Sequence, residues 1–244
     1  MTQFLLTQPY QRQFSRQSKG LNDCNIIDLG LIAYNDAFQF QLKKLNERIN
    51  NKCCDILIIC EHPAVFTLGR LANKENILTD EDALASQNLK VIRVNRGGDV
   101  TFHGPGQLVA YPIFDLAKYK KDLRYFLNRL EETAIQFLKY FGVEVFRRTN
   151  SIGAWFNDYK IASIGIGVKK WVSFHGLAIN INTDLRYFSY IKPCGLDIKM
   201  TSLQGIKHYK INMQHAKRII VDKFASIFGL KIDEKASRRI VGVG

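Results

Sequence analysis

The chain has 244 residues, of which 46% are hydrophobic and 23% are charged. This composition is typical of a globular protein and excludes a largely disordered chain, and the length can bury one sizeable core. Lys and Arg number 35 against 22 acidic residues, a formal net charge of +13, so the surface should attract nucleic acid, anionic membranes or acidic proteins. No run of about 18 apolar residues is present, so we expect no transmembrane helix.

The five cysteines have an odd count and form no CxxC pair. These features argue against a disulfide framework and a zinc site, and they favour a reducing, cytoplasmic compartment. Cys60 ends the apolar run 56–60, so we expect it to be a buried strand residue. The first 20 residues have no acidic side chain and no apolar h-region, which does not fit a secretory signal. They resemble a transit peptide only weakly, and we interpret 1–24 as a basic N-terminal extension.

The first half of the chain is predicted to begin with a strand over 24–29. A helix follows to about residue 50, with its N-cap at Asn35 or Asp36. Apolar runs predict the next strands, which are expected at 55–60, 64–68, 91–95 and 108–114.

The second half begins with a helix over 122–141, which has a regular apolar periodicity and ends before Gly142. The last helix, over 213–228, should be capped by Asn212 and ended by Gly229. Because strands come in runs with few helices between them, the sequence predicts an α+β fold with a mixed, largely antiparallel sheet flanked by helices. We expect one domain over 25–234 and a basic tail over 235–244. The strands between the two helices are expected at 143–147, 154–156, 161–167 and 177–182.

The segment Arg96–Gln107 is the densest candidate binding loop. It holds four glycines, a proline, an arginine and a histidine between two predicted strands. Glycines let a backbone approach a ligand and expose its N–H groups. The spacing fits neither a Walker A loop nor a dinucleotide-binding fingerprint. A tight structural turn is the alternative, but the added polar side chains favour a binding loop.

Three further segments carry reactive residue types. Lys160 begins an otherwise apolar strand, where a solvated edge lysine is the alternative interpretation. His175 and Gly176 precede another apolar strand, and a turn with a satisfied histidine is equally compatible. Cys194 lies between Pro193 and Gly195, which predicts an accessible loop thiol, although most unpaired cysteines are inert small hydrophobes.

Together these segments resemble the lipoyl(octanoyl) transferase family. The family's RGG-x-x-T-aromatic-HGPGQ loop corresponds to 96–107, followed by Tyr-Pro at 111–112. Its KIA, HGLALN and PCG motifs correspond to 160–165, 175–180 and 193–195, in the same order, and an EHP segment precedes them at 61–70. The resemblance extends over roughly residues 26–228.

The resemblance implies a fold similar to the catalytic domains of biotin and lipoate protein ligases. It implies Cys194 as the nucleophile that carries an acyl thioester and Lys160 as its activator. No cofactor and no metal are implied. The residues that the resemblance assigns to acyl binding are Arg96, Gly97, Gly98, Asp99, Val100, Thr101, Phe102 and His103, then Ser163, Ile164 and Gly165, then Gly176, Leu177 and Ala178.

The implied reaction transfers octanoyl, or lipoyl, from acyl carrier protein to a lysine of lipoyl domains. The acceptors would be the 2-oxoacid dehydrogenase complexes and the glycine-cleavage carrier protein. A nearby ammonium favours the thiolate form of a cysteine, and either Lys160 or His103 could accept the proton of the incoming amine. Acidic carriers and lipoyl domains would suit the basic surface. We expect a monomer that binds neither nucleic acid nor membrane.

Two alternatives remain open at this point. An ATP-dependent lipoate or biotin ligase of the same fold would need no catalytic cysteine, which the Cys194 loop argues against. A nucleic-acid-binding module would suit the charge, but the sequence contains no helix-turn-helix, RNA-recognition or zinc-finger pattern.

Overall fold

The computed structural model describes residues 22–193 and 198–232. Within these residues, the main sheet has the strand order β12-β1-β2-β6-β10-β9-β8-β7, with β11 beside β9. The pairs β1–β12, β1–β2 and β11–β9 are parallel and the other five pairs are antiparallel, which confirms the predicted mixed, largely antiparallel sheet. The strands are β1 Asn22–Leu31, β2 Asp55–Glu61, β6 Gln107–Ile113, β7 Phe146–Arg148, β8 Ser151–Phe156, β9 Tyr159–Lys169, β10 Val172–Asn180, β11 Lys199–Met200 and β12 Leu230–Ile232.

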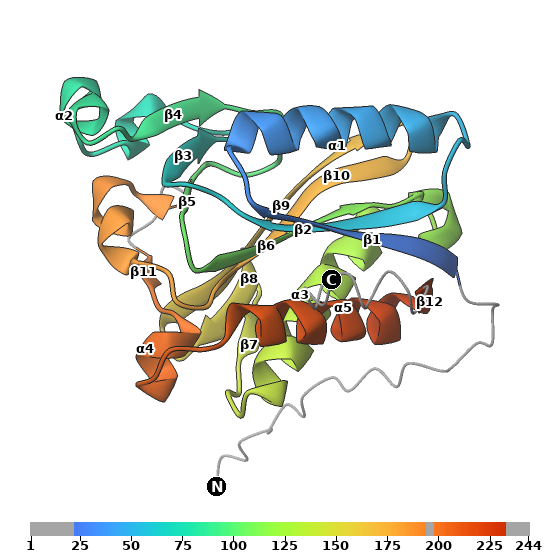
Figure 1. The fold of residues 1–244 in the computed structure, drawn as a ribbon. Coiled ribbons are helices and arrows are strands. Elements are labelled where there is room, and N and C mark those ends of the chain that lie inside the picture. Colours follow the sequence, from blue (N-terminus) through green and yellow to red (C-terminus); the bar gives the residue numbers. More distant parts are fainter. Residues whose placement is uncertain (1–21, 194–197, 233–244) are drawn as a thin grey trace, which may run out of the picture.

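Helices cover both faces of this sheet (Figure 1). Helix α1 (Tyr34–Ile49) lies on one face, and α3 (Leu123–Tyr140) and α5 (Met213–Phe228) lie together on the other. The strand β2 shows why two cores form, because alternate side chains of a strand point to opposite faces. Ile56, Ile58 and Cys60 join the core under α1, whereas Leu57 and Ile59 join the core under α3 and α5. Cys60 is fully buried, as predicted.

A small second sheet lies at one end of the main sheet (Figure 1). Its order is β4-β3-β5, formed by Lys90–Arg93, Val65–Leu68 and Val100–His103. Phe66 and Phe102 are fully buried in its own small core. Residues 96–107 were predicted to form one loop, but Val100–His103 within this segment form β5, which pairs with β3. Short helices complete this fold: α2 Glu81–Ser86, α4 Leu203–Lys207, and the 3-10 helices Lys74–Asn76, Leu116–Tyr119 and Leu185–Tyr190.

The helix ends test the predicted caps. Asn212 accepts a hydrogen bond from the backbone N–H of His215, and Gly229 ends α5 at φ +64°, both as predicted. The cap predicted for α1 is wrong, because the N-cap is Ala33, which makes no side-chain capping bond. The buried Tyr34 is already helical, so the helix starts ahead of the polar residues that suggested a cap.

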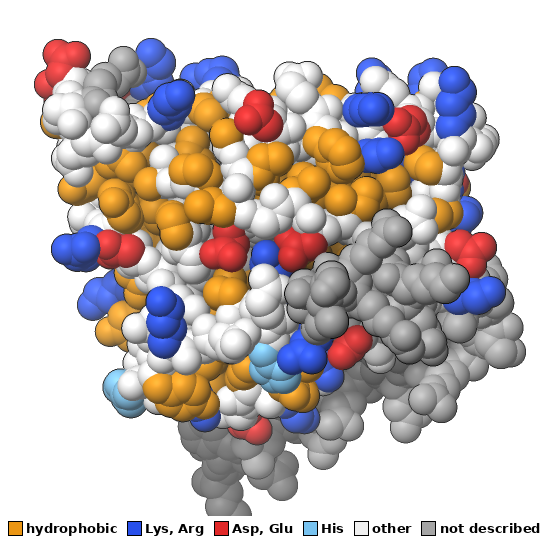
Figure 2. Space-filling view, viewed as in Figure 1, with side chains coloured by type: hydrophobic (Ala, Val, Ile, Leu, Met, Phe, Trp, Pro, Cys, Tyr) orange, Lys and Arg blue, Asp and Glu red, His pale blue; other side chains and the backbone are white. Residues whose placement is uncertain are grey.

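Figure 2 shows one face of the molecule, in the orientation of Figure 1. Lys and Arg side chains are spread around this face, and hydrophobic side chains gather in a band between them. The basic charge is therefore dispersed on this face rather than concentrated in one patch. In the described part of the chain, no helix is long and apolar enough to cross a membrane.

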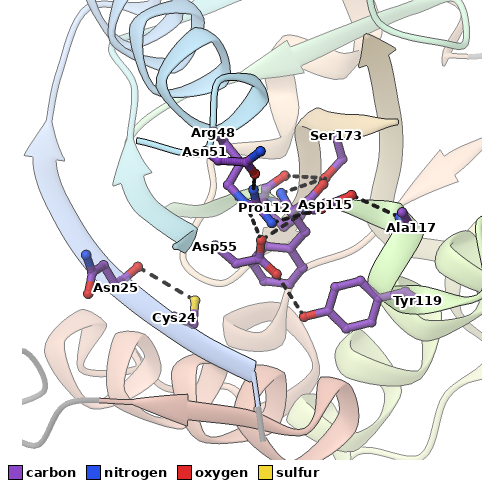
Figure 3. Close-up of polar contacts among 11 residues, drawn as sticks. Cys24, Asn25, Arg48, Asn51, Asp55, Pro112, Asp115, Ala117, Tyr119 and Ser173 are labelled. Carbon is purple, nitrogen blue, oxygen red and sulfur yellow. Dashed lines mark hydrogen bonds and ion pairs between the residues drawn. The ribbon is translucent and has the colours of Figure 1, made fainter. Parts of the chain in front are cut away.

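A buried ion-pair network fixes the start of β2 to the end of α1 (Figure 3). Arg48 Nε donates to Asp55 Oδ1 over 2.7 Å, and Arg48 Nη2 donates to Asp115 Oδ2 over 3.0 Å. The Tyr119 hydroxyl donates to Asp55 Oδ2 over 3.1 Å. Arg48 and Asp55 are almost fully buried, so the loss of either partner would leave an uncompensated charge. This network has a structural role, because none of its residues lines the cavity described next.

Candidate active site

The site begins where β8 separates from β9. The pairing of the two strands extends from Phe156 and Tyr159 only to Gly153 and Ser163, so the rest of this β9 edge is left without a partner strand in the described chain. The glycine-rich loop lies on the open edge, where Gly97 N donates to Ile166 O over 2.8 Å. A side chain at Gly165 would have its Cβ 2.9 Å from Gly97 O, so glycine is required for this close approach.

A cavity of about 430 Å³ opens beside this junction, and we refer to it as the main cavity. It brings together three segments that are far apart in the sequence, namely the glycine-rich loop, β9 and β10. Of the residues predicted for the site, Phe102 is the one described residue that does not line it, since its ring lies in the small core. The predicted residues that line the cavity are Arg96, Gly97, Gly98, Asp99, Val100, Thr101, His103, Lys160, Ser163, Ile164, Gly165, Gly176, Leu177 and Ala178.

Arg96 holds the glycine-rich loop in place. Its guanidinium donates to Thr67 O over 2.7 Å, to Thr67 Oγ1 over 2.9 Å and to Gly97 O over 3.0 Å. The side chain is 7% exposed, although it lines the cavity. Its charge therefore acts on the cavity mainly as a fixed, partly desolvated positive field.

Lys160 is 3% exposed, so the interpretation as a solvated edge lysine is wrong. Its Nζ lies 5.4 Å from the centre of the Trp155 ring, and its side chain passes over Gly153, whose Cβ would stand 2.7 Å from Lys160 Cε. Glu131 holds the Gly153 backbone in place, because its Oε1 accepts the Gly153 N–H over 2.9 Å. The ammonium group is thus held at the cavity wall by packing on both sides.

Cys194 lies outside the described residues, and so does the rest of the segment 194–197. One described flank of this segment contacts Lys160, and the other lines the same cavity. Pro193 lines the main cavity together with Lys160, and Thr201 N donates to Lys160 O over 2.9 Å. The strand β11 pairs Met200 with Lys160.

Three buried histidines lie close together near α1, and two of them, His103 and His175, line the main cavity. His62 Nδ1 lies 2.8 Å from Ile32 O, so its Nε2 accepts from the Tyr111 hydroxyl, also at 2.8 Å. His103 Nδ1 lies 2.6 Å from Gln107 Oε1. The Gln107 amide nitrogen donates to Phe102 O and Asn180 Oδ1, so the amide oxygen must accept from His103.

This arrangement leaves His103 Nε2 as a lone-pair acceptor on the cavity side. Burial, with smaller contributions from the neighbouring His62 and Arg96, lowers the pKa of His103 to about 3. Burial also lowers the pKa of His175 to about 3, and that of His62 to about 4. All three imidazoles are therefore neutral near pH 7.

His175 was expected ahead of a strand, with a turn as the alternative, but it lies within β10 and has φ +56°. Gly176 beside it serves packing, because a Cβ there would stand 2.3 Å from Ala110 O on the neighbouring strand. Both residues line the main cavity, although the close strand packing gives Gly176 a structural role as well.

Sequence reasoning missed several lining residues. Leu123 and Leu127 were assigned to the core face of their helix, and Tyr34 was not singled out. Tyr111 was quoted only as part of a motif. Periodicity could not have identified Leu123 and Leu127 as lining residues, because a residue facing the core and a residue facing a cavity within it have the same helical phase.

In the described chain, no group of His, Cys, Asp and Glu side chains could hold a metal ion.

A model of the lipoyl protein ligase A/B catalytic domain family matches residues 33–225, and the chain belongs to this family. An octanoyltransferase of Caldicellulosiruptor bescii is 45% identical over 208 residues, covering 84% of this chain and 90% of the relative. Among solved structures, a T. acidophilum protein described as a lipoate protein ligase, with bound lipoic acid, has a TM-score of 0.68 at 13% identity and covers 89% of this chain and 94% of that one. The biotin protein ligase of Aquifex aeolicus in complex with biotin and ATP has a TM-score of 0.51 at 11% identity, covering 84% of this chain and 70% of that one. The expected similarity to lipoate and biotin protein ligase folds is confirmed.

Proposed function

We propose that this acyltransferase transfers an octanoyl group from acyl carrier protein to a lysine of lipoyl domains, through a thioester on Cys194. The observation that carries the proposal is the main cavity, in which the buried Lys160 and the glycine-rich loop meet Pro193. The octanoyltransferase relative supports the reaction class, because most of both chains align at 45% identity. The acceptors would be lipoyl domains of 2-oxoacid dehydrogenase complexes and the glycine-cleavage carrier protein.

The cavity suits an apolar acyl chain. Its volume of about 430 Å³ lies within the usual range for small-molecule sites. Ile164 and Leu177 from the sheet and Leu127 from α3 supply apolar walls. An acyl chain lying among these side chains would leave water and gain hydrophobic stabilisation.

In the first step, the Cys194 thiolate would attack the thioester carbonyl carbon of the donor. A new carbon–sulfur bond forms, and the bond to the carrier sulfur breaks. The carrier thiolate leaves and takes up the proton of the Lys160 ammonium, which leaves Lys160 neutral for the second step. A cysteine has an ordinary pKa near 8.5, and a neighbouring ammonium stabilises its thiolate. Lys160 is proposed for this role, because the chain that follows the 194–197 segment pairs with it and Pro193, which precedes the segment, lines the same cavity.

In the second step, the neutral amine of the acceptor lysine would attack the acyl-cysteine. The carbon–nitrogen bond of the amide forms, the bond to Cys194 sulfur breaks, and one amine proton goes to the base. His103 is a weak candidate for that base, since burial lowers its pKa to about 3. We therefore propose Lys160 as the group that relays this proton to the departing Cys194 sulfur.

The surface charge of +13 supports acidic partners, whose encounter would be accelerated by electrostatic attraction. We propose that the enzyme works as a cytoplasmic monomer, without nucleic acid, membrane, metal or cofactor. A salt dependence of the encounter rate, and not of the chemical step, would be the signature of this attraction.

Intact-protein mass spectrometry after mixing the enzyme with octanoyl-acyl carrier protein tests the proposal. We expect one octanoyl adduct that hydroxylamine removes and that maps to Cys194. The Cys194→Ser variant should lack the adduct, whereas Cys53→Ser, at a partly buried cysteine away from the cavity, should retain it. Transfer without any adduct would replace the covalent route with direct attack. Transfer from free octanoate and ATP alone would indicate a ligase instead.

A further inference from the structure

A second cavity lies directly behind the main one. Its volume is about 500 Å³, and it is more open to solvent than the main cavity. We refer to it as the outer cavity. Arg70 lines both cavities, so the two share a wall. The other residues that line the outer cavity are Phe38, Gly69, Arg93, Val94 and Asn95.

The imidazole of His175 lies between the main cavity and two residues of the outer cavity. It lines the main cavity on one side. On the other side the Phe38 ring stacks on it, with centroids 5.2 Å apart and planes 10° apart. His175 Nε2 also lies 2.9 Å from Asn95 Oδ1. Since Phe38 and Asn95 line the outer cavity, the His175 ring together with these two side chains separates the two spaces.

This wall is held rigidly. His175 is 1% exposed, and its backbone N–H donates to Gln41 Oε1 over 2.8 Å. Its Nδ1 lies 3.5 Å from the Tyr34 hydroxyl. Its φ of +56° is unusual for a residue with a Cβ in a strand, and such a conformation persists only where the surroundings enforce it.

We propose that the His175 ring is the stop that limits acyl-chain length, and that removing it joins the main cavity to the outer cavity. This inference rests on the proposed acyl transfer. The acyl chain would run from Lys160 along β9, past Ile164, and its terminal methyl group would meet the imidazole face. Buried and uncharged, the ring can contact a methyl group without the desolvation penalty of an ion.

The strand register gives the length scale. His175 pairs with Ile166, six residues along β9 from Lys160, which is about 20 Å at a rise of roughly 3.3 Å per residue. This span must hold the reacting groups, the acyl chain and the wall. A dodecanoyl chain has four more bonds than an octanoyl chain and needs about 5 Å more at extended-chain geometry. The outer cavity supplies that length only when the ring is absent.

The test compares octanoyl and dodecanoyl carrier thioesters as donors to a lipoyl domain. In His175→Gly the ring is lost, and glycine accepts the positive φ without strain. We expect the dodecanoyl-to-octanoyl ratio of kcat/KM to rise by about 10- to 100-fold, since four additional methylenes become buried. His175→Asn also tolerates a positive φ and should give a smaller rise in the same direction.

His208→Gly is the matched control. His208 also has a positive φ, +60°, and it caps α4 outside both cavities. Its ratio should equal that of the wild type. The inference is overturned if folded His175 variants keep the wild-type ratio, or if the wild type already uses dodecanoyl as well as octanoyl. Failure of the wild type to transfer any acyl group would instead reject the proposed function.

Discussion

The backbone N–H of Gly97 donates a 2.8 Å hydrogen bond to the carbonyl oxygen of Ile166. This contact brings the glycine-rich loop onto β9, although the two residues are 69 positions apart in the sequence. It depends on Gly165, where a Cβ would stand 2.9 Å from Gly97 O and 3.2 Å from Arg96 Cδ. The side wall of the main cavity is therefore made by two pieces of backbone that approach more closely than side chains would allow.

Gly165→Ala should displace the loop, lower transfer activity by at least about tenfold and cost about 1–3 kcal/mol of unfolding free energy by overpacking. Gly97→Ala is the matched comparison for stability, because its Cβ would meet nothing closer than Ile166 O at 3.5 Å. Thermal unfolding of the two variants measures the difference. Equal melting temperatures would contradict the claimed close approach.

Thr67→Val should weaken the hold on Arg96. The threonine is fully buried, and its hydroxyl oxygen accepts from the Arg96 guanidinium over 2.9 Å. Leaving this charged donor poorly satisfied should cost about 1–3 kcal/mol and raise KM for the acyl donor. Thr67→Ser keeps the hydroxyl and should behave like the wild type. Chemical denaturation and steady-state kinetics on both variants test this, and a stable Thr67→Val protein would refute it.

Lys160→Ala should lower kcat/KM by at least about 100-fold, as expected for the loss of a proton-transfer group. Lys199→Ala removes the same charge from the neighbouring strand β11, where the residue is exposed, and should have little effect. The readout is the rate of acyl-adduct formation as a function of pH. If Lys160 lowers the thiol pKa, the pH midpoint of this rate should move upward in Lys160→Ala. An unchanged midpoint would contradict that role.

The three buried histidines predict a stability profile. Burial lowers the pKa of His62 to about 4, and of His103 and His175 to about 3, from ordinary values near 6.5. Between those values the unfolded chain binds more protons than the folded one, so the free energy of unfolding falls as pH falls below about 6.5. Each histidine should contribute a loss on the order of 2 kcal/mol at pH 5. Denaturant titrations from pH 7.5 to 5 measure this. His208→Gln should leave the slope intact, and His103→Gln should reduce it.

Asp55→Ala should lower the stability of the protein without lowering its transfer activity. Its carboxylate is fully buried and accepts from both Arg48 and Tyr119, so its removal should cost about 3–5 kcal/mol. The network lies at the opposite end of β2 from His62, roughly 20 Å away along the strand. At temperatures where the variant is folded, kcat/KM should match the wild type. A large loss of activity in the folded variant would indicate coupling between the two ends of the sheet.

The sequence predicted the main helices and the fold class because these depend on local periodicity and on the order of strands. Asp122 at α3 and Asn212 at α5 act as caps, and both lie where the apolar pattern begins. The cap of α1 was misassigned, because the burial of Tyr34 overrides the local polar signal. Strand β5 was missed, since its residues pair with β3 across more than 30 positions of sequence.

For the site, the predicted residues that the structure describes line one cavity, apart from Phe102, whereas Cys194 lies outside the described residues. Phe102 alternates with Thr101 and His103 along β5, and its side chain therefore points into the small core. The burial of Lys160 could not be predicted, because it depends on Trp155 and Gly153 of the adjacent strand. The position of His175 between the two cavities could not be predicted either, because Phe38 and Asn95 contact it from other elements.

The early separation of β8 from β9 also matters for the solubility of the protein. A strand edge with unpaired backbone groups is a template on which another chain can add a strand. Here the edge beyond Ser163 is covered by the glycine-rich loop, through the bond from Gly97 to Ile166. The glycine-rich loop, which would hold the acyl group, thus also covers a strand edge that could pair with another chain. Variants that loosen this loop should therefore aggregate as well as lose activity.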